Sequence, residues 1–467
     1  MKTSTQILTE AEIEQIESQA LRILSDVGIK VYNQELRHKA KQAGLVVDDE
    51  VVRIPPEIVR WAIGAAPREW CLYGRNGSRL PLTKGNCHLS TYADGLFVLD
   101  YRASEPRPST EQDLVDFVRL GQAANEIAIV GPVCYARDYP EPVQLLHTAK
   151  VVMLHSDKHI NIGPLNLDEA RTWYELAEIA SPGIDQQQTP TLSIVVSPTS
   201  PLQFDQDTSQ VFTFAVEKKI PFLACSCPMA GGSSPLSLVG TIVLHLAEDL
   251  FLLALAQLLQ EGTPVILAGA AGIMDVRKGA LSYGAPERNL LLGAMIDIAD
   301  YYHLPHHSPA GSVDSWYPDI QTGAHKMQTW MARKASGVIL GIGFGSLLTG
   351  KVVSREQFLI DIDLWHMTER YFEGLDLSRL AEAFQVIQRV GHGGSYLADE
   401  QTFELMRAKE IYLSDLVNLE GSQRADMWER AHHKVERGLA SHLFKPQPDI
   451  SEAIERFVAE KEKFLRR

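Results

Sequence analysis

Short apolar runs recur through the middle of the chain, and each is followed by a longer stretch with helical spacing of its apolar positions. Several runs lack polar alternation, which is typical of parallel strands covered by helices. There are eight runs, the number that a closed barrel requires. They are AIVGPVCY (128–135), HINIGPL (159–165), TLSIVVSP (191–198), PFLACSCP (221–228), PVILAGAAG (264–272), LPHHSPAG (304–311), GVILGIGFG (337–345) and FLIDIDLW (358–365).

The two ends of the chain have other patterns. Apolar residues have helical spacing over residues 10–27 and, after a proline, over residues 56–65. In residues 70–101, apolar and polar residues alternate between turns that contain Gly and Asn, which is typical of short antiparallel strands. After about Tyr371 the pattern is helical again, interrupted by VGHGGSYL around His392. The sequence thus predicts an α/β protein with a (β/α)₈ TIM barrel at 121–372. An N-terminal α+β extension is expected at 1–120, and a C-terminal helical segment at 373–467.

Two of the eight runs are open to a second interpretation, since LPHHSPAG could be a loop and FLIDIDLW a helix. An open doubly wound sheet is the main alternative fold, but no G-x-G-x-x-G turn follows the first strand. The apolar segment 236–259 approaches membrane-spanning length and carries His245, Glu248 and Asp249, so we interpret it as a buried helix.

Charge and composition narrow the possible functions. The 44 Lys and Arg residues against 59 Asp and Glu residues give a formal net charge of −15, which disfavours nucleic acid and anionic membranes as partners. The polar, acidic N-terminus lacks the pattern of a secretory signal, and the five scattered cysteines suit a reducing compartment, so a cytoplasmic location is expected.

The usual chemical motifs do not occur. The sequence has no H-E-x-x-H, no G-x-x-x-x-G-K-[ST] and no G-x-S-x-G, and Cys225 and Cys227 are interpreted as structural cysteines. We therefore expect no tightly bound metal. A barrel decarboxylase would carry several arginines at its strand ends to hold substrate carboxylates, and the runs show none there.

Chemistry in such a barrel lies at the carboxyl ends of the strands, so polar and aromatic residues after each run are the first candidates. Those at the mouth are Tyr135, Asn161, Ser197, Met229, Asp275, His307, Asp314, Trp316 and Phe344. Each could instead cap a helix or order a loop. Aromatic residues in loops, among them Tyr92, Phe97, Tyr101, Tyr283 and Tyr317, could hold a trimethylammonium cation on their faces or simply pack the loops.

Five segments resemble the recurrent blocks of the trimethylamine methyltransferase family. They are RIPPEIVRWAIGAAPREWCLYGRN (53–76), CPMAGGSSPLSLVGTIVLHLAE (227–248), MDVRKGALSYGAPERNLL (274–291), YYHLPHHSPAGSVDSWYPDIQTG (301–323) and VGHGGSYLADEQT (390–402). The resemblance implies a TIM barrel that moves a methyl group from a methylated amine to the cobalt of a corrinoid (cobalamin) on a cognate partner protein. Because the chain contains only standard residues, it resembles the branch without pyrrolysine, whose members act on quaternary amines such as glycine betaine.

The resemblance also gives the candidate residues their roles. Candidate catalytic residues are Asp275, Glu287, His307 and Asp314, and candidate substrate-binding residues are Tyr92, Asp94, Phe97, Tyr283, His306, Trp316, Phe344 and His392. The glycine-rich loop at His392 is expected to reach the barrel mouth. A betaine-binding sensor or accessory protein on the same barrel is the alternative function, and a homo-oligomer is possible.

Overall fold

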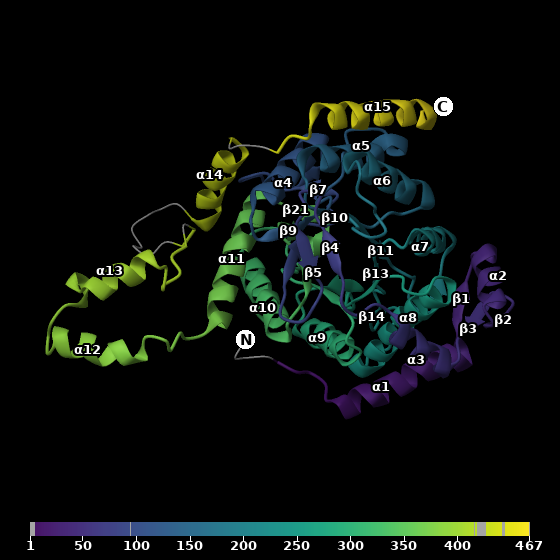
Figure 1. Ribbon diagram of the computed structural model, residues 1–467, viewed down its shortest axis with the longest axis horizontal. Coiled ribbons are helices and arrows are strands. Elements are labelled where there is room, and N and C mark those ends of the chain that lie inside the picture. Colours follow the sequence, from purple (N-terminus) through teal and green to yellow (C-terminus); the bar gives the residue numbers. More distant parts are fainter. Residues whose placement is uncertain (1–4, 94, 415, 418–425, 441–443, 467) are drawn as a thin grey trace.

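Eight parallel strands form a closed barrel in the computed structural model, which describes residues 5–93, 95–414, 416–417, 426–440 and 444–466. Figure 1 shows the barrel at the centre of the molecule, inside a ring of helices. In chain order its strands are β6 (His88–Ser90), β9 (Ile127–Val130), β10 (His159–Ile162), β11 (Leu192–Val196), β13 (Phe222–Ala224), β15 (Val265–Ala268), β18 (His306–Pro309) and β19 (Leu340–Ile342). Pairing of β19 with β6 and of β6 with β9 closes the ring.

One helix follows each barrel strand along the chain. These helices are α4 (Glu111–Ala123), α5 (Glu141–His155), α6 (Leu167–Ala180), α7 (Gln206–Lys218), α8 (Leu238–Leu259), α9 (Pro286–Tyr301), α10 (Ile320–Ser336) and α11 (Arg355–Glu373). Asp205 caps α7 by accepting from the Thr208 amide and Asn166 caps α6, whereas α5 and α9 have a proline at their start and no side-chain cap. The predicted (β/α)₈ fold is confirmed.

The barrel strands differ from the eight predicted runs in two places. The last run is not a strand, and the first strand lies before the first run. The run LPHHSPAG contains strand β18, but FLIDIDLW lies inside helix α11. Its buried apolar residues Phe358, Ile362 and Trp365 have helical spacing, and its buried Asp361 pairs with Lys326 of α10 at 2.6 Å. The barrel instead takes its first strand from His88–Ser90, within the segment assigned to the N-terminal extension.

The N-terminal elements cover the outside and one end of the barrel. They are α1 (Glu10–Arg22), a π-helical turn (Ile23–Val27), β1 (Ile29–Val31), α2 (Gln34–Gln42), β2 (Val46–Asp48), β3 (Val51–Arg53), α3 (Pro56–Ala65), β4 (Cys71–Tyr73) and β5 (Arg79–Pro81). Strands β1 to β3 form a sheet with β12 (Gln203–Phe204). The β4–β5 hairpin packs Leu72 and Leu80 against the interior residues Ile129, Leu223 and Ile266, and so closes the amino-terminal end of the barrel.

Two small sheets rise from the carboxyl ends of the barrel strands. One joins β14 (Met229–Ala230), β16 (Gly272–Asp275) and β17 (Ala280–Ser282). The other joins β20 (Ser346–Leu347), β21 (Val352–Val353), β7 (Phe97–Val98) and β8 (Arg107–Pro108), with a 3₁₀ turn at Leu348–Gly350. The mouth of the barrel is therefore walled by strands as well as loops.

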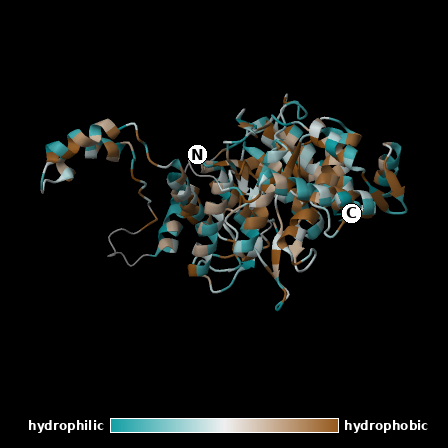
Figure 2. Cartoon of the chain, turned by 90° about the horizontal axis from the view of Figure 1, so that it is seen from below, coloured by the Kyte–Doolittle hydropathy of each residue, from teal (hydrophilic) through white to brown (hydrophobic). Residues whose placement is uncertain are grey.

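The C-terminal segment contains an arm that stands clear of the barrel in both views (Figures 1 and 2). Helix α12 (Leu380–Val390), a 3₁₀ turn (Tyr396–Ala398) and α13 (Glu400–Arg407) form the arm. The chain then returns through α14 (Met427–Ala440), which contacts α11 and α4, and α15 (Pro448–Leu465), which contacts α5 and α6.

Helix α8 is the one helix in the described residues that is long and apolar enough to cross a membrane. In the structure, 78% of its apolar window is buried inside the protein. Its polar residues have internal partners: Glu248 accepts from Ser200 and the Leu202 amide, and Asp249 accepts from the Ser226 amide. The interpretation as a buried helix is confirmed.

Candidate active site at the barrel mouth

Alternation along the strands brings a set of polar side chains into the upper interior of the barrel. Asn161 of β10 donates to Ser193 Oγ of β11 at 2.9 Å, and Ser197, just beyond β11, donates to the Cys225 carbonyl at 2.7 Å. The sequence placed Asn161 and Ser197 at this mouth. They form a hydrogen-bonded wall on one side of it.

Tyr92 lies across the mouth. It follows β6, and its ring occupies space left by two glycines, because a Cβ at Gly131 would lie 2.9 Å from Tyr92 Cβ and a Cβ at Gly163 would collide with the Tyr92 hydroxyl. Gly131 follows β9 and Gly163 follows β10. The ring is therefore held over the ends of these two strands, as a wall that a ligand can contact.

His307 points into the barrel. Its register partners, Ala268 of β15 and Leu340 of β19, both line the interior. Both ring nitrogens are buried and bond to no described group. Burial, with a smaller contribution from His306, lowers the pKa of His307 to about 3. The imidazole is thus neutral near neutral pH and presents one donor and one acceptor to the interior.

Cys225 and Cys227, both interpreted as structural cysteines, differ in exposure. Cys225 is buried, but Cys227 is exposed at the mouth, with its sulfur 3.9 Å from Ser197 Oγ. Hydrogen bonding with Cys225, and less so with Ser197, holds the pKa of the Cys227 thiol below its usual value. No group of three or more metal-ligating side chains occurs in the described residues.

Asp314 organises the rim of the mouth. Its carboxylate accepts from Ser282 Oγ at 2.6 Å, from the Tyr283 amide at 2.6 Å and from the Gly284 amide at 3.0 Å. The loop after β18 is thereby tied to the loop between β17 and α9. This arrangement makes Asp314 a positioning residue for Tyr283.

Sequence reasoning missed Arg288, which lies in the first turn of α9. The guanidinium carbon of Arg288 lies 4.0 Å from the centre of the Tyr283 ring. Its Nε donates to the Ala271 carbonyl at 2.9 Å, and a terminal nitrogen donates to Ser312 Oγ at 2.8 Å. Since Ala271 follows β15 and Ser312 follows β18, the guanidinium lies at two strand ends. An arginine thus reaches the strand ends from a helix start, which lies outside the apolar runs.

Three candidate residues lie away from the mouth. Phe344 is fully buried and packs against Trp330 and Phe358, so it belongs to the core and cannot wall an open pocket. His306 faces the helix layer, with its Nε2 3.4 Å from Asp300 of α9. His392 is exposed in the arm between α12 and the 3₁₀ turn (Figure 1), so the expectation that its loop reaches the mouth of the same chain is wrong.

Other candidates already have partners near the rim. Asp275 is bound by Arg277 at 3.0 Å, and Glu287 is exposed in the first turn of α9, where it interacts favourably with the helix dipole. The Phe97 ring carries the Arg137 guanidinium at 5.5 Å. Trp316 is 38% exposed and touches Tyr317 edge-on. Asp94 lies outside the described residues.

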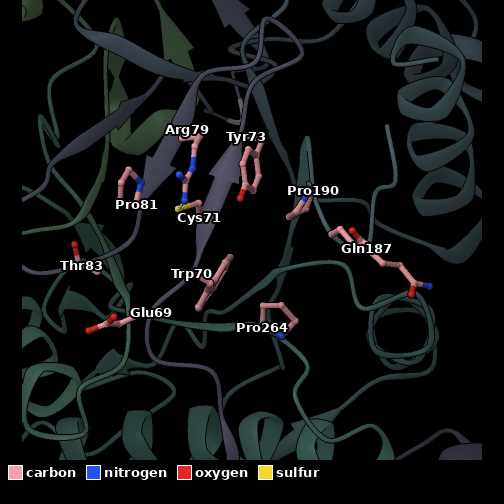
Figure 3. A pocket seen from close by; sticks show the side chains of 11 residues that line it. Glu69, Trp70, Cys71, Tyr73, Arg79, Pro81, Thr83, Gln187, Pro190 and Pro264 are labelled. Carbon is pink, nitrogen blue, oxygen red and sulfur yellow. Dashed lines mark hydrogen bonds between the residues drawn. The ribbon is translucent and has the colours of Figure 1, made fainter. Parts of the chain in front are cut away.

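A cleft of about 580 Å³ lies at the opposite end of the barrel (Figure 3). Its lining includes Trp70, Arg79, Pro190 and Pro264, and these two prolines precede β11 and β15. The cleft is therefore at the amino-terminal end, where barrels carry stabilising rather than catalytic residues. We place the candidate site at the mouth, where the polar and exposed groups converge.

Comparisons with known proteins agree with this fold. The sequence profile of the trimethylamine methyltransferase (MTTB) family matches residues 2–465. The trimethylamine methyltransferase of Methanosarcina thermophila is 30% identical over 454 residues, with 94% of each chain covered. The glycine betaine methyltransferase of Desulfitobacterium hafniense (strain Y51) is 28% identical over 467 residues, covering 98% of this chain and 97% of the relative.

Among solved structures, the Methanosarcina barkeri monomethylamine methyltransferase superposes with a TM-score of 0.54 at 12% identity. The superposition covers 98% of this chain and 89% of that protein. At this identity the likeness shows the fold alone.

Proposed function

Since this chain belongs to the trimethylamine methyltransferase family, we propose that it moves a methyl group from a quaternary amine, with glycine betaine as the first candidate, to the Co(I) of a corrinoid on a separate protein. The observation that carries the choice of a quaternary amine is the Tyr92 ring across the mouth, because an aromatic face binds a fixed trimethylammonium cation. The chain also contains only standard residues, and the full-length relative named a glycine betaine methyltransferase supports the same substrate.

The residues at the mouth suit a transfer that needs no acid. A quaternary ammonium leaves as a neutral amine when its C–N bond breaks, so the enzyme has chiefly to position the methyl group and exclude water. His307 is neutral and Tyr92 is an aromatic wall, which fits this task. Asp314 positions Tyr283, whose ring lies against the Arg288 guanidinium, and the corrinoid supplies a strongly nucleophilic cobalt.

The rim suits a protein partner that carries the corrinoid. Large apolar side chains are exposed on loops after several barrel strands, and such exposed apolar groups mark interaction surfaces. They are Leu96, Leu165, Leu236, Val276, Trp316 and Ile320. We propose that this rim receives the corrinoid protein.

None of the five cysteines forms a disulfide, which supports a cytoplasmic location.

The test is a donor panel assayed with cob(I)alamin by visible spectroscopy. Glycine betaine, carnitine, choline, proline betaine and trimethylamine are each supplied with the enzyme and reduced cobalamin or its partner protein. Formation of methylcobalamin with a quaternary amine, and little with trimethylamine, is expected. Activity with trimethylamine alone would overturn the substrate, and tight binding without any transfer, given an active partner protein, would favour the sensor function.

A further inference from the structure

Arg288 is a buried cation that has no acidic partner in the part of the chain that the structure describes. Its side chain is only 3% exposed. A guanidinium has five N–H donors, and the hydrogen bonds with Ala271 and Ser312 use two of them. Three donors on the two terminal nitrogens remain. Burial of an uncompensated charge is costly, so such a group calls for a ligand of opposite charge.

The guanidinium of Arg288 lies near Cys227, which is exposed at the mouth. The guanidinium is fixed from two sides, by the Ala271 carbonyl and Ser312 hydroxyl at its edge and by the Tyr283 ring on its face. Its charge contributes to lowering the pKa of the Cys227 thiol, and Cys227 is exposed at the mouth. A fixed guanidinium loses little entropy when it binds a carboxylate with two parallel hydrogen bonds.

Arg288 and Tyr92 lie on opposite sides of the mouth. The strand order around the barrel is β10, β11, β13, β15, β18, β19, β6 and β9, so the ends of β15 and β18 face those of β9 and β10. Arg288 is anchored at the first pair, and the Tyr92 ring covers Gly131 and Gly163 at the second pair. An anion site and an aromatic wall therefore face each other across one opening.

We propose that Arg288 binds the carboxylate of the methyl donor, so that the site selects zwitterions with a quaternary ammonium at one end and a carboxylate at the other. The ammonium contacts Tyr92 while the carboxylate accepts hydrogen bonds from the terminal nitrogens of Arg288. This specificity role rests on the proposed function and deepens it. Trimethylammonium compounds without a carboxylate, such as choline, leave the buried cation uncompensated and bind weakly.

Titration calorimetry with three ligands on the wild-type protein tests the proposal. Glycine betaine carries both charges, 3,3-dimethylbutanoate replaces its ammonium with a carbon and keeps the carboxylate, and choline keeps only the cation. Glycine betaine is expected to bind about 10- to 100-fold more tightly than choline, the range for a charge-assisted hydrogen-bonded pair. The butanoate should bind measurably. Equal affinity for glycine betaine and choline contradicts the proposal, as does failure to bind any of the three.

Arg288→Met and its matched control give the residue-specific test. Arg288→Met should weaken both carboxylate ligands about 10- to 100-fold and leave choline within about twofold of the wild type. Arg333→Met is the control, because Arg333 is also buried but lies in the helix layer, bonded to Ser308 and Asn289. It should change the affinities for the three ligands alike. An equal loss for choline and glycine betaine in Arg288→Met would assign the arginine a purely structural role.

These outcomes are separable from those of the methyl-transfer assay. Arg288-dependent carboxylate binding without methyl transfer would keep this inference and overturn the proposed activity. Equal methyl transfer from choline and glycine betaine would keep the activity and overturn the inference. If Arg288→Met does not fold, the wild-type ligand series decides, since it needs no variant.

Discussion

Two glycines determine where the ring of Tyr92 can lie. Gly131 and Gly163 have no side chains in the space that the ring and its hydroxyl occupy, and a Cβ at Gly163 would collide with that hydroxyl. The ring carbon bearing the hydroxyl is 3.4 Å from the same Cβ position, which is an ordinary contact. The ring can therefore take this position because residue 163 is a glycine, whose missing Cβ leaves space for the Tyr92 hydroxyl.

Gly163→Ala should move the Tyr92 ring and weaken binding of quaternary amines, by at most about 30-fold if a full cation–π contact is lost. Removal of the hydroxyl relieves the collision, so Gly163→Ala combined with Tyr92→Phe should bind more tightly than Gly163→Ala alone. Gly323→Ala in α10 is the control, because a Cβ there meets nothing within 4 Å. Fluorescence or calorimetric titration measures all three. A double variant as weak as the single one would refute this account of the ring position.

His307 should make the protein sensitive to acid. Burial lowers its pKa to about 3 in the folded chain, whereas an unfolded chain has a histidine pKa of about 6.5. Between these values the unfolded state binds the extra proton, so stability increases with pH and is lost as the pH falls from about 6.5 towards 3. Other buried histidines such as His159, whose pKa is lowered to about 4, act in the same direction.

His307→Gln removes an imidazole that binds one of these extra protons in the unfolded state. Its unfolding free energy should fall less steeply than that of the wild type as the pH is lowered from 6.5 to 4, measured by urea denaturation at several pH values. The exposed Gln388 serves as the control, and Gln388→Ala, which removes no titratable group, should leave the slope unchanged. A slope for His307→Gln equal to that of the wild type would mean that His307 is not held neutral in the folded protein.

At the scale of elements, the loop between β17 and α9 depends on Asp314. Three hydrogen bonds join its carboxylate to Ser282, Tyr283 and Gly284. Asp314→Ala should destabilise the fold by about 1–3 kcal/mol and speed hydrogen exchange at the Tyr283 and Gly284 amides. Ser282→Ala, which removes one of the three bonds, should leave that exchange nearly unchanged. If Asp314→Ala abolished methyl transfer while exchange stayed slow, the carboxylate would act in catalysis itself.

The barrel helices and seven of its strands could be predicted because long apolar runs and periodic helices leave a strong pattern. Strand β6 could not, since it has three residues, two of them the polar His88 and Ser90, which face the interior. The run at 358–365 is ambiguous because helix α11 is buried along a broad stripe and its Asp361 is neutralised by Lys326. Lys326 lies in another helix, so this ion pair cannot be read from the run.

The site was harder to predict than the fold. The sequence indicated His307, Asn161, Ser197 and Tyr92, since all of them lie at or just beyond strands. It missed Arg288, because this side chain comes from a helix start and turns back to two strand ends. It also misplaced Phe344, since the tight packing with Trp330 depends on α10, a separate element. Contacts between elements that are far apart in the sequence determine where these two side chains lie.

At the scale of the whole molecule, the arm exposes apolar side chains to water. Leu380, Phe384 and Ile387 have helical spacing along α12 and are between 59% and 70% exposed, and Phe403 and Met406 of α13 are also exposed. A patch of this kind marks an interface. If the homo-oligomer considered from the sequence forms through this patch, substitutions in it should break the assembly.

Phe384→Glu combined with Ile387→Lys should lower the mass of the assembly, measured by light scattering after gel filtration, and leave the thermal unfolding of the barrel unchanged. The control replaces the exposed polar Gln388 of the same helix by Lys. A wild-type protein that is monomeric at micromolar concentration would exclude this role of the arm.

In the proposed reaction, a methyl group moves from a quaternary amine to cobalt through the mouth of this barrel. Glycine betaine labelled with ¹³C in its three methyl groups, followed by NMR with reduced cobalamin or the partner protein, tests it most directly. One label is expected on the cobalt, together with an equal amount of dimethylglycine that retains the other two. Label that stays entirely in glycine betaine, with an active methyl acceptor present, would contradict it.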